Sequence, residues 1–248
     1  MKFKVCKLWI LTGLIILLGA CSKPEIESLT RPENAVSGRQ TWSQLVNIKT
    51  LQADAILAWQ ATNGEHGKYK VRLFVALPDR LKIQWLSPWG SVVGQVLIAG
   101  KQFWLTDTRH KQTWHGMTAD FEKILQERGE PFTVVATQFF KFWPLLFGTP
   151  EADDRYSSPV VFIEYLAVGS GENLSLAKTV VARTGEELHF RLFELKKLST
   201  EQLMPLAVKI FSQSGQISIN LRKYKLNSDI SADTFIYKLK NFTIREAM

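Results

Sequence analysis

Cys21 is the residue whose chemistry the sequence marks most clearly. It directly follows Leu18-Gly19-Ala20, at the end of an apolar stretch from Leu8 to Leu18 that is preceded by three lysines within the first seven residues. A basic start, an apolar stretch and small residues form the layout of a secretory signal peptide. The apolar stretch is about eleven residues long, whereas a permanent membrane helix needs ~20. The pattern therefore predicts an exported chain with a nucleophilic thiol at its processing site.

The tetrapeptide Leu18-Gly19-Ala20-Cys21 resembles the bacterial lipobox. The resemblance implies that residues 1–20 are removed as a lipoprotein signal peptide and that Cys21 is diacylated. Each buried acyl CH₂ contributes about 0.8 kcal/mol, so several chains on one cysteine give an anchor that hardly dissociates. The alternative is a plain secretory signal that happens to end near a cysteine.

Two further residues bear on where the processed chain resides. Cys6 leaves with the signal, so acylation of Cys21 leaves no thiol for a disulfide or for thiolate chemistry. Ser22 follows the cysteine, whereas in well-studied envelopes an aspartate there marks lipoproteins held at the inner membrane. By analogy we expect lipid anchoring to the outer membrane, with the folded part facing the periplasm.

Residues suited to catalysis or metal binding form no convincing site. The sequence has no Gly-x-Ser-x-Gly elbow, no phosphate-binding glycine loop and no His-Glu-x-x-His helix. Asp107, His110 and His115 flank an expected hairpin and lack a fourth ligand, so surface histidines are the preferred interpretation over a metal site. Glu186-Glu187 lies in an expected turn and is more simply solvated. We expect no enzyme activity, no metal and no cofactor.

Charge and length limit the remaining classes. The formal net charge is +8 over 248 residues, and three of the lysines belong to the signal. A mild basic excess suits contact with anionic headgroups, although a solvated basic surface is the simpler interpretation. The basic residues are scattered among expected strands, so we expect no nucleic-acid partner. The remaining chain fits one domain of ordinary size.

The elements begin after a segment without hydrophobic period. Residues 21–40 contain Pro24, Pro32 and Gly38 and predict a flexible tether. The folded domain is expected over 41–248. Trp42, Leu45, Val46, Ile48 and Leu51 have helical spacing, with Thr41 or Ser43 as the N-cap, so a first amphipathic helix is predicted.

Alternating apolar and polar residues predict about a dozen strands, most of them joined by short turns. Short connections cannot hold a crossover helix, so the sheet should be an antiparallel meander. The expected strands are Ala53–Gln60, Lys68–Ala76, Arg80–Leu86, Gln95–Ala99, Gln102–Asp107, Gln112–His115, Val160–Val168, Leu174–Thr184, Glu187–Leu195, Met204–Ser212, Gln216–Lys225 and Thr234–Leu239.

The region 118–148 differs from its surroundings. Phe121, Ile124 and Leu125 have helical spacing, and a second apolar stripe follows from Phe139 to Phe147. Pro144 should kink or split that second helix, because proline cannot donate to the helical ladder.

This order of elements resembles the LolA/LolB lipoprotein-localisation family. The stretch from Pro78 to Gly90, the strand pair around Gly100 to Leu105 with Trp114-His115-Gly116, and Trp143 to Pro150 are similar to LolB-type receptors and related lipoproteins. The closing strands from Pro205 to Leu239 resemble the carrier as much as the receptor. The fold class implied by the resemblance and by the strand pattern is the same: mainly β with a few helices (α+β), as a single antiparallel curved sheet forming an incomplete barrel, with helices over the open side.

The resemblance further implies an apolar cup for the acyl chains of another lipoprotein or of a lipid. The alternative for every lining residue is an ordinary filled core. The helices would supply a lid formed by Phe139, Phe140, Trp143 and Phe147. The lining candidates from one face of each strand are Leu57, Val71, Leu73, Leu81, Ile83, Trp85, Phe103, Leu105, Phe190, Leu192, Val208 and Ile219.

One loop is a candidate for membrane contact. Pro88, Trp89 and Gly90 join two expected strands, and turn formers on both sides favour an exposed indole. LolB-type receptors carry an exposed apolar side chain on the corresponding loop, usually aliphatic, so the resemblance implies that this loop inserts into the membrane. An indole suits the interface because it combines an apolar ring with a polar N–H. The alternative is that Trp89 folds back onto the sheet edge.

The sequence as a whole predicts a lipoprotein that binds acyl chains and acts in lipoprotein reception and insertion at the inner leaflet of the outer membrane. Its expected partners are lipidated proteins or phospholipid, together with a soluble periplasmic carrier. The alternative is a non-catalytic assembly or structural lipoprotein that uses the same fold as a protein-interaction platform. It predicts a packed interior and partner contacts on the outer face.

Overall fold

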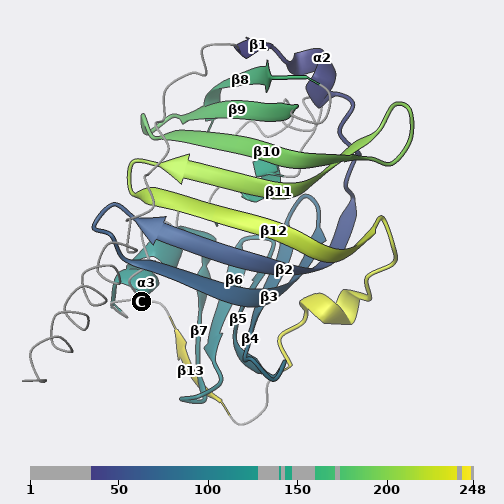
Figure 1. The fold of residues 1–248 in the computed structure, drawn as a ribbon. Coiled ribbons are helices and arrows are strands. Elements are labelled where there is room, and N and C mark those ends of the chain that lie inside the picture. Colours follow the sequence, from purple (N-terminus) through teal and green to yellow (C-terminus); the bar gives the residue numbers. More distant parts are fainter. Residues whose placement is uncertain are drawn as a thin grey trace, which may run out of the picture.

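A computed structural model describes residues 35–127, 140, 143–146, 160–170, 174–238 and 242–246. Within these residues the chain forms one 13-stranded sheet (Figure 1). The strands are β1 (Ala35–Ser37), β2 (Thr50–Ala61), β3 (His66–Ala76), β4 (Arg80–Leu86), β5 (Val92–Ala99), β6 (Gln102–Asp107), β7 (Gln112–Met117), β8 (Val160–Val168), β9 (Ser175–Ala182), β10 (Glu187–Lys197), β11 (Leu203–Ser212), β12 (Gly215–Leu226) and β13 (Thr243–Glu246).

The sheet consists of two antiparallel meanders, β2 to β7 and β8 to β12, joined by pairing of β12 with β2. Strands β1 and β13 form its two edges, so the barrel is not closed. Among the described strands, only β13 runs parallel to its neighbour. It pairs with β7, and Thr243 lies opposite Gln112. Figure 1 shows the sheet curving from the layer that contains β8–β12 and β2 towards β4–β7. The predicted fold class, an open and largely antiparallel curved sheet, is confirmed.

Alternation of burial gives the sheet an apolar inner face and a mixed outer face. In β2 the side chains alternate between half-buried and buried from Thr50 to Trp59, as period two requires when one face packs on a core. The inner face is the one that carries Leu57, Leu73, Ile83 and Phe190, which belong to one buried apolar cluster. Register aligns these residues across strands, for example Leu73 with Ile83.

Short helical segments cover part of this inner face. A 3₁₀ turn η1 (Thr118–Asp120) leads into α3 (Phe121–Glu127), and residues 143–146 are also helical. Phe121 packs edge-on against Phe103 with ring centres 4.9 Å apart, so α3 lies on the core side of β6. Helices after residue 118 and around Trp143 were predicted, and those in the described residues are present. Pro144 lies within the described residues 143–146, but the flanking residues needed to judge the predicted kink lie outside the described ones.

The predicted first helix is wrong over most of its length. Helix α2 is a four-residue turn (Arg39–Trp42), its N-cap is Gly38 rather than Thr41 or Ser43, and Leu51 lies in β2. The chain leaves the helix because Val46 N–H donates to Leu203 O at 2.8 Å and Leu45 forms a bridge with Leu203. Strand β1 pairs with β8 inside the segment expected as tether, so the folded part includes residues from Ala35 onward.

The predicted strand Thr234–Leu239 is also wrong. A 3₁₀ helix η3 (Ala232–Phe235) occupies its start, with the Ser231 side chain accepting from Asp233 N–H. Phe235 is buried, and Tyr237 Oη lies 2.7 Å from Thr113 Oγ1 on the outer face of β7. The segment crosses the sheet instead of extending it, because its aromatic residues cover the outer face and the edge of β7 is occupied by β13.

Candidate functional site

The loop between β4 and β5 is a tight and internally bonded hairpin turn. Ser87 N–H donates to Ser91 O at 2.8 Å, and Gly90 N–H donates to Ser87 O at 2.9 Å. The Ser87 and Ser91 hydroxyls lie 2.7 Å apart. Gly90 has φ +85°, a left-handed conformation that glycine adopts without steric cost. Pro88 suits the first corner of such a turn because its ring fixes φ. The loop therefore holds its tip in one conformation.

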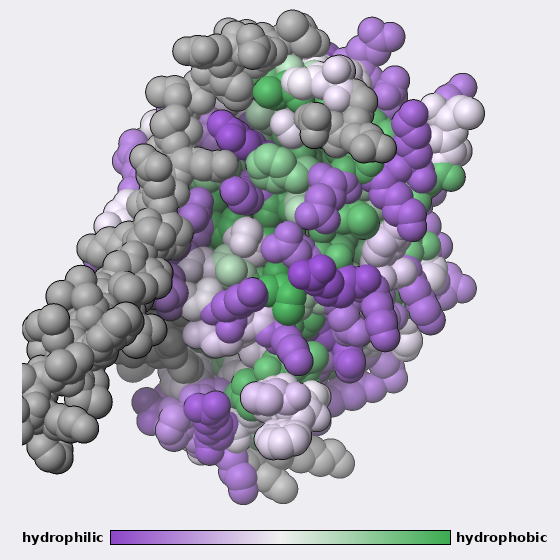
Figure 2. All heavy atoms as spheres, viewed as in Figure 1, coloured by the Kyte–Doolittle hydropathy of each residue, from purple (hydrophilic) through white to green (hydrophobic). Residues whose placement is uncertain are grey.

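Trp89 stands at this tip and is 94% exposed. It is the most exposed of the large apolar side chains in the described chain, followed by Ile244 at 55%. The indole does not fold back onto the sheet edge, which was the alternative considered for this loop. Tryptophan normally buries 150–250 Å² of surface, so a fixed loop that keeps an indole in water is unfavourable for a free molecule. Figure 2 shows a mixed surface on the visible face, with hydrophilic residues around and between apolar ones.

Aromatic side chains line the inner face near the same end of the sheet. Tyr69 lies on the inner-face side of β3, directly beyond Val71, and is 40% exposed. Trp85, which pairs with Val71, and Trp114, which pairs with Leu105, are partly buried against the core. These three rings form the aromatic rim: Tyr69, Trp85 and Trp114. The Trp89 loop begins two residues after Trp85, so loop and rim lie at one end of the apolar face.

The twelve predicted lining residues all lie on the inner face and are brought together in the core. Trp85 is partly buried and packs against the core cluster. The other eleven have exposures of 9% or less: Leu57, Val71, Leu73, Leu81, Ile83, Phe103, Leu105, Phe190, Leu192, Val208 and Ile219. In this conformation they have almost no contact with solvent.

Two of the four predicted lid residues fall in the described chain. Phe140 packs edge-on against Phe121 of α3, with ring centres 4.7 Å apart. Trp143 is buried at 3% exposure. Phe139 and Phe147 lie outside the described residues, as do Cys21 and the signal peptide. Phe140 and Trp143 thus contribute to the cover over the inner face.

Lys178 is a central residue that sequence reasoning missed. It is 1% exposed and belongs to β9, in register with Tyr165 and Phe190. Its ammonium group lies 5.0 Å from the centre of the Trp42 ring and 5.5 Å from that of Phe190, and it donates to the Leu145 carbonyl. Aromatic faces attract a cation, which offsets part of the cost of burying it. In the sequence, the only indication that Lys178 points inward is its position two residues from each of the inward residues Leu176 and Val180.

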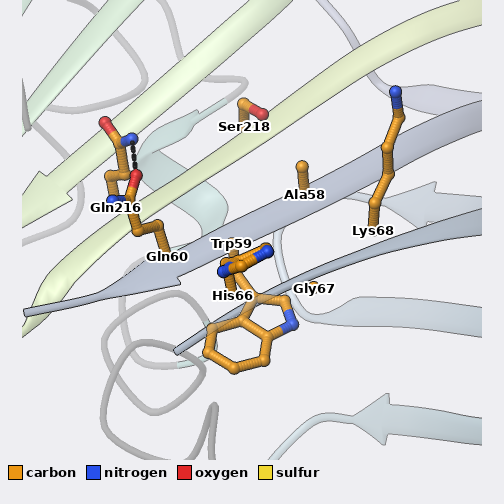
Figure 3. Close-up of a pocket in the computed structure, with 8 residues that line it drawn as sticks. All are labelled: Ala58, Trp59, Gln60, His66, Gly67, Lys68, Gln216 and Ser218. Atoms are coloured by element: carbon orange, nitrogen blue, oxygen red, sulfur yellow. Dashed lines mark hydrogen bonds between the residues drawn. The ribbon is translucent and has the colours of Figure 1, made fainter. Parts of the chain in front are cut away.

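A pocket of about 230 Å³ lies on the outer face of the sheet, on the side opposite the predicted acyl cup. Figure 3 shows its residues on β2, β3 and β12, where Gln216 Nε2 donates to Gln60 Oε1 at 2.9 Å. On β3, His66 lies opposite Gln60 and Lys68 lies opposite Ala58. The pocket offers amide and cationic groups, but no carboxylate or thiol lines it.

Asp107, His110 and His115, the candidate metal ligands of the sequence, have different partners in the structure. His110 Nδ1 lies 2.7 Å from Asp107 Oδ2, whereas His115 stacks on Trp104 with ring centres 4.8 Å apart. The structure thus pairs two of these residues and separates the third. Within the described residues no group of three histidine, cysteine or acidic side chains could hold a metal ion. None of the described helices combines the length and the apolar character needed to cross a membrane.

Comparison with known proteins shows similarity of the fold alone. No protein-family model matches the sequence, and no curated protein matches it. Among solved structures, the chain is similar to a LolA superfamily protein from Nitrosomonas europaea, with a TM-score of 0.47 and 8% identity over 80% of this chain and 94% of that one. A DUF1329 family protein from Desulfovibrio piger gives 0.49 and 8% over 82% and 97%.

A domain from Vibrio parahaemolyticus, assigned to outer-membrane lipoprotein sorting, gives a TM-score of 0.46 at 10% identity, over 79% of this chain and 92% of that one. Similarity at this level does not establish a shared family or a shared ligand. What this chain binds has to follow from its own residues.

Proposed function

We propose that this chain is a lipid-anchored envelope protein that binds acyl chains on its inner face and contacts a membrane through Pro88, Trp89 and Gly90. The observation that carries the proposal is the 94% exposure of Trp89 on an internally bonded loop beside the aromatic rim. Transfer of the indole from water to a membrane interface removes the cost of exposing it. The loop then places a bilayer next to the rim.

Acyl binding requires the helical cover to move, because the lining side chains are buried in this conformation. Helix α3 and residues 143–146 pack on the inner face and form the helical cover, and helix α2 also packs there through Trp42. Displacing the helical cover exposes apolar surface on the inner face. A hydrocarbon chain that covers this surface gains about 25 cal/mol for each Å² of apolar surface removed from water. Cargo would therefore pass towards the site that buries more of its acyl surface, without a nucleotide or a metal.

The anchor belongs to the same proposal. Acylated Cys21 would hold the protein at the inner leaflet of the outer membrane, and the residues up to 34 would set its reach. Lipidated proteins or phospholipid would be the cargo, delivered by a soluble periplasmic carrier. The pocket on the outer face favours the rival function, a protein-interaction platform, since it offers a contact surface that acyl binding does not use.

The test measures transfer of a fluorescent lipoprotein from its soluble carrier to liposomes, with the purified full-length protein as acceptor. Wild type should accelerate transfer and retain fatty acyl ligand detectable by mass spectrometry. Trp89→Glu should slow the delivery to liposomes at least tenfold while acyl retention persists. Leu198→Glu is the matched control, since Leu198 is 40% exposed in the turn between β10 and β11, at the opposite end of the strands.

Each result has a definite meaning for the proposal. Transfer by Trp89→Glu at the wild-type rate would remove the loop from the function. Purified protein without any acyl ligand and without transfer activity would leave the platform function in its place.

A further inference from the structure

The turn between β6 and β7 lies next to the Trp89 loop. Gly94 of β5 pairs with Asp107 of β6, so both connections are at the same end of the strands. Thr108 N–H donates to Val93 O at 3.2 Å, and Thr108 Oγ1 donates to Val92 O at 3.1 Å. The turn is thereby fastened to the strand that leaves the Trp89 loop.

This turn presents basic side chains on a rigid frame. Asp107 Oδ1 accepts from the N–H groups of Arg109 and His110 at 2.9 and 3.2 Å, and Asp107 Oδ2 lies 2.7 Å from His110 Nδ1. The one carboxylate in the turn is therefore occupied by backbone and imidazole groups. Arg109 and Lys111 are both exposed. On the other side of the Trp89 loop, Lys70 pairs with Leu86 and is also exposed.

We propose that Arg109 and Lys111, together with Trp89, form a docking surface for anionic phospholipid. The inference rests on the membrane contact proposed above and assigns the lipid class. An indole at the interface brings the neighbouring basic groups to headgroup level, where each lysine or arginine raises binding to an anionic surface roughly fivefold. A zwitterionic surface offers no such gain, so this end of the protein should bind anionic membranes more tightly than zwitterionic ones.

The test uses the full-length protein with vesicles of brominated phosphatidylcholine, with or without phosphatidylglycerol. Bromine on acyl chains quenches an inserted indole, and subtracting the signal of Trp89→Phe isolates Trp89 from the other tryptophans. Phosphatidylglycerol should raise the binding constant for Trp89 insertion at least tenfold, and salt should reverse the gain because exposed charges are screened.

Two double variants test the basic turn. Arg109→Gln with Lys111→Gln should lose most of the gain on phosphatidylglycerol and keep the wild-type value on phosphatidylcholine alone. Arg109→Lys with Lys111→Arg should retain it, since the charge is conserved. The matched control is Arg80→Gln with Lys101→Gln, which removes the same charges from exposed residues at the opposite ends of β4 and β6. It should behave as wild type.

The outcomes separate the two proposals. Equal quenching of Trp89 in both kinds of vesicle, or an unchanged gain in the Arg109→Gln and Lys111→Gln variant, overturns the lipid assignment and leaves membrane contact standing. Absence of Trp89 quenching in every vesicle overturns both.

Discussion

The Lys178 ammonium group lies 5.0 Å from the centre of the Trp42 indole, inside the end of the sheet formed by β8 to β10. Trp42 is fully buried and its Nε1–H donates to Leu166 O at 3.2 Å. The same ammonium group donates to Leu145 O in the helical cover. One buried cation thus connects β9, helix α2 and the segment that covers the inner face.

Two tryptophans should respond to truncation in opposite ways. Trp42→Ala removes a fully buried ring and should cost about 3–5 kcal/mol of unfolding free energy, because a cavity remains where the ring packed. Trp89→Ala removes an exposed ring and should change stability by less than about 0.5 kcal/mol. Urea denaturation of both variants measures the difference. Equal costs would mean that Trp89 packs against the protein in solution.

Lys178→Met should loosen the helical cover without removing apolar bulk. The bond to the Leu145 carbonyl is lost, whereas methionine can still pack against the rings of Trp42 and Phe190. Hydrogen exchange should speed up in peptides that contain residues 143–146, and a fluorescent fatty acid should bind several-fold faster. Lys196→Met is the control, since Lys196 is exposed and its ammonium group lies 5.9 Å from the centre of the Tyr224 ring, away from the helical cover. Unchanged exchange in Lys178→Met would show that Lys178 does not hold the cover.

The sequence predicted the strands far better than the segments that cross them. Strands β4 and β6 have the predicted bounds, because Leu81 and Ile83 alternate with polar residues and one face is buried. The helix expected from Thr41 to Leu51 fails because Leu45 and Val46 contact Leu203 of β11, which is 158 residues after Leu45, and the spacing of apolar residues does not reveal so distant a contact. Strand β13 is exposed at all four residues and therefore leaves no hydrophobic pattern.

The candidate site was recognisable to different degrees. The exposed position of Trp89 followed from the turn formers Pro88 and Gly90, whose conformations are local. Lys178 was missed because lysine is almost never fully buried, so its inward phase on β9 was outweighed by its charge. The position of the basic turn at Arg109 beside the Trp89 loop depends on the pairing of β5 with β6. This pairing could be inferred only from the order of the predicted hairpins.

Acidification should destabilise the protein in part through His189. Burial lowers the pKa of His189, the nearby Arg191 lowers it further, and Glu187 opposes both. At weakly acidic pH the unfolded chain therefore binds a proton that the folded chain does not, so this contribution to stability is lost as the pH falls from the ordinary histidine pKa to the lowered one. His189→Gln should flatten that part of a plot of unfolding free energy against pH. A plot with the wild-type slope would assign the dependence to other groups.

Gly215 should be the least replaceable glycine at the junction of the two meanders. It begins β12 with φ +144°, and a Cβ there would lie 2.2 Å from the Gln60 carbonyl oxygen in β2. Backbone atoms of a paired strand cannot yield as a side chain can, so Gly215→Ala must push β12 away from β2 and should cost about 3 kcal/mol or more. Gly64→Ala is the control: Gly64 also has positive φ, +89°, but a Cβ would meet nothing within 4 Å, so only the local strain of about 1–2 kcal/mol applies. Urea midpoints of the two variants should separate accordingly, and equal midpoints would mean that the β12–β2 junction tolerates the added atom.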